Sequence, residues 1–137
     1  MDVIQIPFAK HIGIERKDEG TLKLEPLQRV QNHIQSIHAS AQFALAETQS
    51  GLFLQEVFPE YVGKVVGVLR SSTVKYKASA MTTIVAKATL DDEAKKKFSV
   101  QLERKGRATI AIDVSILDEE GIVTMQGAFT WFIQKLG

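Results

Sequence analysis

The second half of the sequence alternates between apolar and polar side chains with a period of two. In "ATIAIDVSIL", residues 108–117, one set of alternate positions is apolar and the other is mostly polar. The stretches "TTIVAKATL" at 82–90 and "IVTMQGAFTWFI" at 122–133 alternate similarly, and "KVVGVLRSSTVKYKA" at 64–78 is long and β-branched. Such alternation, with tight turns such as "DEEG" at 118–121, predicts four long strands of an antiparallel sheet with one buried face.

Only one long segment has the composition of a helix. Residues 39–57 hold good helix formers and no Pro, so we expect a helix that begins near Ser36–Ala39, with Ser36 as its N-cap, and ends before Pro59. One helix cannot form a layer against that much sheet. It must lie across the sheet, and the sheet must curl around it. Small side chains would let the two backbones approach closely: Ala39, Ala41, Ala44, Ala46, Ser50 and Gly51.

The other segments are shorter. Residues 2–11 are expected to form a lead-in helix, and residues 12–27 two short strands around the polar turn at Asp18–Gly20. The charged stretch "DDEAKKK" at 91–97 is expected to be a solvated connection. Because no repeat, Pro-rich linker or low-complexity tract interrupts the chain, residues 1–137 are predicted to form one α+β domain.

Composition excludes several classes of protein. The 17 Lys and Arg nearly balance the 16 Asp and Glu, so nothing indicates a nucleic-acid or membrane partner. The absence of Cys excludes a disulfide scaffold and a Cys nucleophile, and the three His lack metal-binding spacing. There is no Gly-rich phosphate loop, no GxSxG motif and no long apolar run. No secretory signal is evident, so a cytoplasmic location is expected.

Glu47 is the most unusual residue of the predicted helix. Helical spacing puts it on one face with mostly apolar or small side chains, including Phe43, Gly51 and Leu54. Glu47 either lies at a helix edge, where it reaches water or a cation, or faces a cleft with a raised pKa and a chemical role. Upstream, Asn32 and His38 have ordinary explanations as a turn residue and a first-turn polar residue.

The spacing of these three residues resembles a motif of the hotdog-fold acyl-CoA thioesterases, in particular the phenylacetate-pathway and 4-hydroxybenzoyl-CoA types. Asn32 precedes His38 by six residues, and Glu47 follows it by nine. The stretches "FAKHIGIERKDEGTLKLEPL", "SSTVKYKASA" and "RKGRATIAIDVSILDEEGIVTMQGAFTWFI" also resemble the family, in the right order. Two departures are His38-Ala39-Ser40 in place of His-Gly-Gly, and the lack of a Pro near Ala78–Ser79.

The resemblance implies a hotdog fold, in which a curved antiparallel sheet wraps one long central helix, and it implies roles for individual residues. The N–H of Ala39, after His38, would polarise a thioester carbonyl, and Asn32 would orient the carbonyl or the water. Glu47 would act as general base or nucleophile from the neighbouring subunit of a homodimer. Whether two dimers stack into a homotetramer is left open. No cofactor is implied, since coenzyme A is part of the substrate.

Two further groups of residues follow from the same resemblance. A strand hydroxyl often supports the attacker, and we expect Thr73 or Ser71, which alternation separates from Ser72. The phosphates of coenzyme A need cations, for which the candidates are Lys75, Lys77, Arg104, Lys105 and Arg107. Both groups have an alternative explanation. The hydroxyls could be ordinary strand residues without a function, and the cations could belong to a solvated hairpin tip.

Two other functions fit the sequence. A regulatory acyl-CoA or fatty-acyl binding protein on the same fold would keep the cleft and the helix N-terminus without depending on Glu47 for turnover. The altered motif at His38-Ala39-Ser40 slightly favours this protein, whereas Asn32 and Glu47 at the family's spacing favour the enzyme. A structural dimerisation module would bind no coenzyme A. The acyl group, aromatic or aliphatic, and its carrier, coenzyme A or acyl-carrier protein, are open at this stage.

Overall fold

Six strands and three α-helices make up the computed structural model, which describes residues 1–137. The first third of the chain contains short elements: η1 (Val3–Gln5), α1 (Pro7–Ile12), β1 (Glu15–Arg16), β2 (Leu22–Leu24) and η2 (Gln28–Val30). The long elements follow: α2 (Ala39–Val57), η3 (Pro59–Tyr61), β3 (Val65–Tyr76), β4 (Ile84–Thr89), α3 (Asp92–Lys105), β5 (Arg107–Leu117) and β6 (Val123–Lys135).

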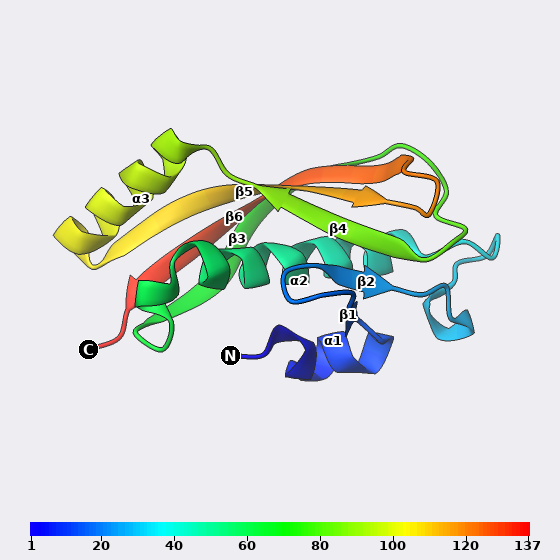
Figure 1. The fold of residues 1–137 in the computed structure, drawn as a ribbon, viewed down its shortest axis with the longest axis horizontal. Coiled ribbons are helices and arrows are strands. Elements are labelled where there is room, and N and C mark those ends of the chain that lie inside the picture. Colours follow the sequence, from blue (N-terminus) through cyan, green and yellow to red (C-terminus); the bar gives the residue numbers. More distant parts are fainter.

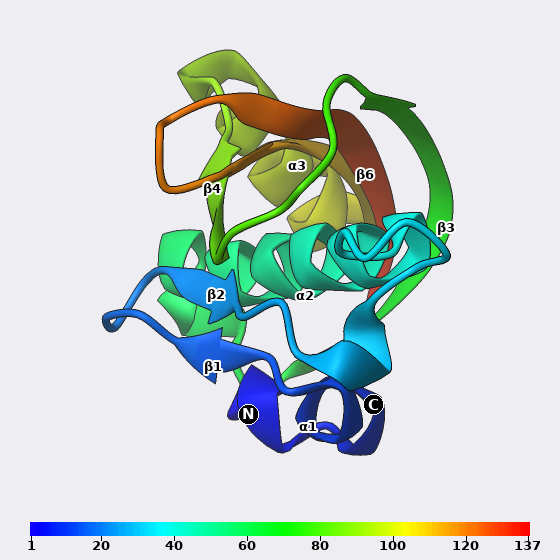
Figure 2. The same cartoon turned by 90° about the vertical axis from the view of Figure 1, so that its right-hand side faces the viewer.

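The six strands form one antiparallel sheet in the order β1-β2-β4-β5-β6-β3. The sheet curves around α2, with β2 on one side of the helix and β3 on the other (Figures 1 and 2). The N-terminal segment with α1 lies on the side of α2 away from the strands β5 and β6 (Figure 2). This arrangement confirms the predicted hotdog fold. None of the helices is long and apolar enough to cross a membrane.

The core lies between α2 and the concave face of the sheet. The alternate apolar positions of β5 are buried, as the period of two predicts, and Ile112 and Ile116 are fully enclosed. On β6, Phe129 is also fully buried, and its ring meets the ring of Phe43 edge to face at 5.3 Å between centroids. The helix contributes small side chains and the fully buried Leu45, so it sits close to the strands.

The helix α2 begins at Ala39, within the predicted range, but its cap differs from the prediction. His38, not Ser36, is the N-cap, and its Nδ1 accepts a hydrogen bond from the N–H of Ser40 at 3.0 Å. Ser36 lies two residues earlier, where its buried hydroxyl accepts from the Nδ2 of Asn32 at 2.7 Å. Its side chain is therefore committed to the preceding loop and cannot cap the helix.

The prediction of a solvated connection at 91–97 is wrong, because this stretch leads into and begins the helix α3. Asp91 caps this helix by accepting from the N–H of Ala94 at 2.7 Å, and Gly106 ends it in the left-handed conformation with φ at 72°. One face of the helix is buried through Phe98 and Leu102, which stand four residues apart. The remaining charged residues point to water, which is why the segment looked like a connection.

Candidate active site

Glu47 lies in the third turn of α2, on the face that contacts β6. Its neighbours on this face touch the strand: Phe43 packs on Phe129, and Gly51 lies beside the ring of Trp131. Burial raises the pKa of the Glu47 carboxyl, and no charged group or hydrogen bond contributes to that shift. The carboxylate is thus half-buried and has no ion-pair partner in its own chain, and a raised pKa of this kind makes Glu47 a candidate functional residue.

The first turn of α2 presents one free backbone donor. The N–H of Ala39 has no hydrogen-bond partner, and Ala39 is an exposed residue, whereas the N–H of Ser40 is occupied by the His38 ring. The carbonyl of Ala39 accepts from the hydroxyl of Tyr76 on β3 at 3.1 Å, which ties the helix start to that strand. A free N–H at a helix N-terminus can stabilise a developing negative charge. Ala in place of Gly leaves this donor available.

Asn32 holds the loop that leads into α2. Its Oδ1 accepts from the N–H groups of Ile34 and Ser36, both at 3.0 Å, and its Nδ2 donates to the Ser36 hydroxyl. These contacts are those of a residue that makes its own turn. They use the carboxamide oxygen fully and leave one Nδ2 hydrogen, so the main role that the geometry gives Asn32 is to position the loop.

The pairing of β3 with β6 shows which strand hydroxyl faces the helix, and it confirms that Ser72 is separated from Ser71 and Thr73. Cross-strand neighbours share a face of the sheet, and Ser72 is paired with the buried Phe129, so Ser72 points toward α2. Ser71 is paired with Thr130 and Thr73 with Ala128, on the other face. Within one chain, the preference for Thr73 or Ser71 is therefore not supported, and Ser72 is the hydroxyl on the helix side.

The five candidate cations do not form one site. Arg107 is paired with Gln134 at one end of β6, and Lys75 is paired with Gln126, eight residues along the same strand. At about 3.3 Å per residue this separation is roughly 26 Å. Lys75 also borders a shallow pocket that contains the carboxylate of Asp113, which opposes phosphate binding. Lys77 follows the end of β3, and its N–H donates to the Thr124 carbonyl at 2.9 Å.

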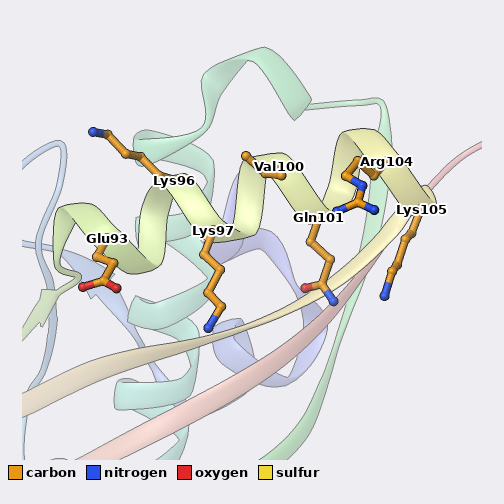
Figure 3. Close-up of a pocket in the computed structure, with 7 residues that line it drawn as sticks. All are labelled: Glu93, Lys96, Lys97, Val100, Gln101, Arg104 and Lys105. Carbon is orange, nitrogen blue, oxygen red and sulfur yellow. The ribbon is translucent and has the colours of Figure 1, made fainter.

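Arg104 and Lys105 belong to a cationic face of α3. This face borders an open hollow of about 490 Å³ that is lined from α3 alone, with Lys96 and Lys97 as further cations. Figure 3 shows the side chains spread along the helix, with Lys96 extending to one side and Lys97 to the other. The arrangement is that of a solvated helix face. Lys96 and Lys97 were not among the predicted cations, because the stretch at 91–97 was expected to be a connection rather than a helix.

No three His, Asp or Glu side chains come close enough to hold a metal ion. The groups near the start and middle of α2 that can take part in chemistry are Glu47, the free N–H of Ala39 and the hydroxyl of Ser72. Ala39 and Glu47 stand eight residues apart on one helix, which is about 12 Å along its axis. The two groups of a single chain are too far apart to contact the same carbonyl.

One long helix wrapped by a curved antiparallel sheet is the hotdog fold. The chain belongs to the family described as "Domain of unknown function (DUF4442)", whose model matches residues 6–133. A comparison with curated protein sequences finds no match.

Solved structures share the fold at low sequence identity. PA5026 from Pseudomonas aeruginosa, described as a probable thioesterase, is 21% identical with a TM-score of 0.82, over 98% of this chain and 91% of that one. BH2602 from Bacillus halodurans, determined with CoA, is 18% identical with a TM-score of 0.71, over 92% and 74%. SAV0944 from Staphylococcus aureus, described as a thioesterase enzyme, is 15% identical with a TM-score of 0.67, over 93% and 98%. These likenesses confirm the predicted hotdog fold, which the chain shares with proteins described as thioesterases.

Proposed function

We propose that the protein is an acyl-CoA thioesterase whose active site forms between two subunits of a homodimer. The observation that carries this proposal is Glu47, a half-buried carboxylate with a raised pKa and no partner in its chain. A general base works best when its pKa approaches the working pH, and desolvation moves Glu47 in that direction. The fold shared with BH2602, which was determined with CoA, supports the choice of carrier.

The chemistry follows from the groups available. Glu47 takes a proton from water, whose oxygen attacks the thioester carbonyl carbon. The carbonyl oxygen becomes an oxyanion held by the N–H of Ala39. The carbon–sulfur bond then breaks, the thiolate receives the proton from Glu47, and a carboxylic acid and a thiol leave. If Glu47 instead attacks directly, it forms a mixed anhydride with the acyl group, which water hydrolyses in a second step. Ser72 is the hydroxyl available to orient the water.

The requirement for two subunits rests on distance. Reacting atoms must come within about 3–3.5 Å of each other, so both groups must touch one carbonyl. The separation of about 12 Å between Ala39 and Glu47 on one helix forbids this within a chain. If two antiparallel helices lie side by side, Glu47 of each meets the first turn of the other.

An exposed edge of the sheet offers a means of dimerisation. β3 is the outermost strand, 12 residues long, and has a strand neighbour on one side only. Its side chains Val66 and Val68 are 51% and 56% exposed. A long exposed edge strand of this kind is normally paired or covered. Pairing β3 with β3 of a second copy would continue the sheet and bring the two α2 helices to the same concave face.

The test is thiol release from a panel of acyl-CoAs, aromatic and aliphatic, followed with a thiol-reactive dye. The chain contains no Cys, so the protein itself gives no signal. We expect Glu47→Gln to lower kcat by at least about a hundredfold, the usual contribution of a general base. Glu56→Gln, the same change at an exposed position of the same helix, should keep full activity. Saturable acyl-CoA binding with no turnover of any thioester would contradict the enzyme and identify an acyl-CoA binding protein.

A further inference from the structure

An apolar cavity of about 250 Å³ lies between the second half of α2 and the adjoining ends of β3 and β6. Gly51 and Leu54 of the helix form one wall, and Trp131 and Ile133 of β6 form another. No charged side chain lines it. Met1 and Val3 of the N-terminal segment close one side. The interior therefore suits an uncharged, apolar occupant.

The cavity continues the helix face that carries Glu47. Gly51 lies four residues after Glu47, and Leu54 lies seven residues after Glu47. All three residues therefore lie on one side of α2. Gly51 is the lining residue nearest to Glu47 along the helix, and because it has no side chain it leaves the entrance of the cavity open. A Cβ placed there would lie 3.6 Å from the ring of Trp131, an ordinary contact distance, so any larger side chain would fill the gap.

We propose that this cavity binds the acyl chain of the substrate, and that it accepts a saturated straight chain of about eight carbons. The length follows from volume, since 250 Å³ equals about eight times the roughly 30 Å³ that a water molecule occupies, and a methylene group is of similar size. The proposal rests on the proposed function, because it assumes that the thioester lies at Glu47.

The far end of the cavity is a rigid aromatic wall. Phe98 of α3 packs on Phe58 with 4.8 Å between ring centroids, and Tyr61 meets Phe98 edge to face at 6.4 Å. The Tyr61 hydroxyl donates to Glu103 at 2.8 Å, and Glu103 pairs with Lys135 at 3.0 Å. These contacts fix the wall from both sides. Phe98, which α3 contributes, is thus the residue that limits the chain length.

Trp131 provides a direct measurement, because it is the only Trp of the chain and lines the cavity. We would titrate the protein with straight-chain primary alcohols of increasing length and follow Trp131 fluorescence. These probes contain neither a thioester nor coenzyme A, so they report on the cavity alone. The affinity should rise about fourfold for each added methylene and level off near eight carbons.

Variants at the entrance and at the far wall test the geometry. Gly51→Leu should abolish the response, and Gly51→Ala, which adds one methyl group, should weaken binding by about fourfold. Phe98→Leu keeps an apolar side chain but makes it smaller, so it should move the length limit to longer chains. Val100→Ala, on the exposed side of α3, is the matched control and should change nothing.

The thioester panel is then run on the wild type and on Gly51→Leu. Loss of octanoyl-CoA turnover in this variant, with acetyl-CoA turnover retained, supports the cavity as the acyl site. Alcohol binding without turnover of any thioester would leave the cavity in place and overturn the proposed function. Turnover with the same chain preference in both proteins, or no fluorescence change with any alcohol, would overturn the cavity assignment.

Discussion

The hydrogen bond between Ser50 and Trp131 should be a measurable link between α2 and the sheet. The Ser50 side chain is fully buried, and its Oγ accepts from Trp131 Nε1 at 2.8 Å while it donates to the Glu47 carbonyl at 2.6 Å. Ser50→Ala removes both contacts and leaves the indole N–H half-buried without a partner. This perturbation lies beside the candidate base and beside the cavity, so it tests how that region is held.

The expected loss can be worked from these contacts. A buried donor left unsatisfied costs about 1–3 kcal/mol. Ala is a better helix former than Ser by up to roughly 0.5 kcal/mol. The free energy of unfolding should therefore fall by about 0.5–2.5 kcal/mol. For a chain of 137 residues, each kcal/mol corresponds to about 3–4 °C in Tm. Urea unfolding and thermal scans at one fixed protein concentration would measure both, since association shifts apparent stability.

Two further variants separate this bond from other effects. Thr48 on the same helix donates only to the Ala44 carbonyl at 2.6 Å, so Thr48→Ala should change the free energy of unfolding by no more than about 0.5 kcal/mol. A double-mutant cycle with Trp131→Phe should give a coupling of about 1 kcal/mol. An unchanged or higher stability of Ser50→Ala, or a coupling near zero, would refute the reasoning.

Three other substitutions should change the free energy of unfolding in a direction that the structure predicts. Burial raises the pKa of Glu47 above its ordinary value of 4.5, so the free energy of unfolding of the wild type should fall as pH rises from 4.5 through the folded pKa. In urea unfolding, Glu47→Gln should therefore be more stable than wild type at pH 7 and equal to it below pH 4.5. Gly127→Ala would put a Cβ 2.6 Å from the Val74 Cγ1 atom, so overpacking should cost about 1–3 kcal/mol in the same assay. His38→Ala removes the cap on the Ser40 N–H and should lower the free energy of unfolding by about 0.5–1 kcal/mol; an unchanged value would show that the cap is dispensable.

The strand pattern and the central helix were predictable because both depend on local periodicity. Alternation identified the buried positions of β5 correctly, and the expected helix at 39–57 matches α2. The helix α3 was missed for a physical reason. Only two of its side chains, Phe98 and Leu102, are buried, so its charged composition outweighed a weak helical period. The spacing of four between these two residues was the available signal.

The orientation of β3 could not be read from the sequence. Alternation separates Ser72 from Ser71 and Thr73, but it does not say which face meets the helix. Val66 and Val68 would be assigned to the core by hydrophobicity, yet they are exposed at the edge strand. A register irregularity between Leu69 and Ser71 also breaks the period. The register of β3 against β6 determines which of its side chains face the helix, and such long-range pairing is a property of the folded chain.

The central claim is that each active site combines Glu47 of one subunit with the N–H of Ala39 of the other. Two inactive variants test it most directly. Glu47→Gln lacks the base. Ala39→Pro lacks the N–H, and Pro is well suited to the first position of a helix, so folding should be preserved. Each variant alone should lose about a hundredfold or more in thiol release.

The two variants are then mixed, allowed to exchange subunits, and assayed for thiol release. With random exchange half of the dimers are mixed, and each mixed dimer has one intact site, so activity should return to about one quarter of the wild-type value. Glu47→Gln mixed with itself is the control and should remain inactive. If the mixture also remains inactive although exchange is complete, the site lies within one chain and the account is contradicted.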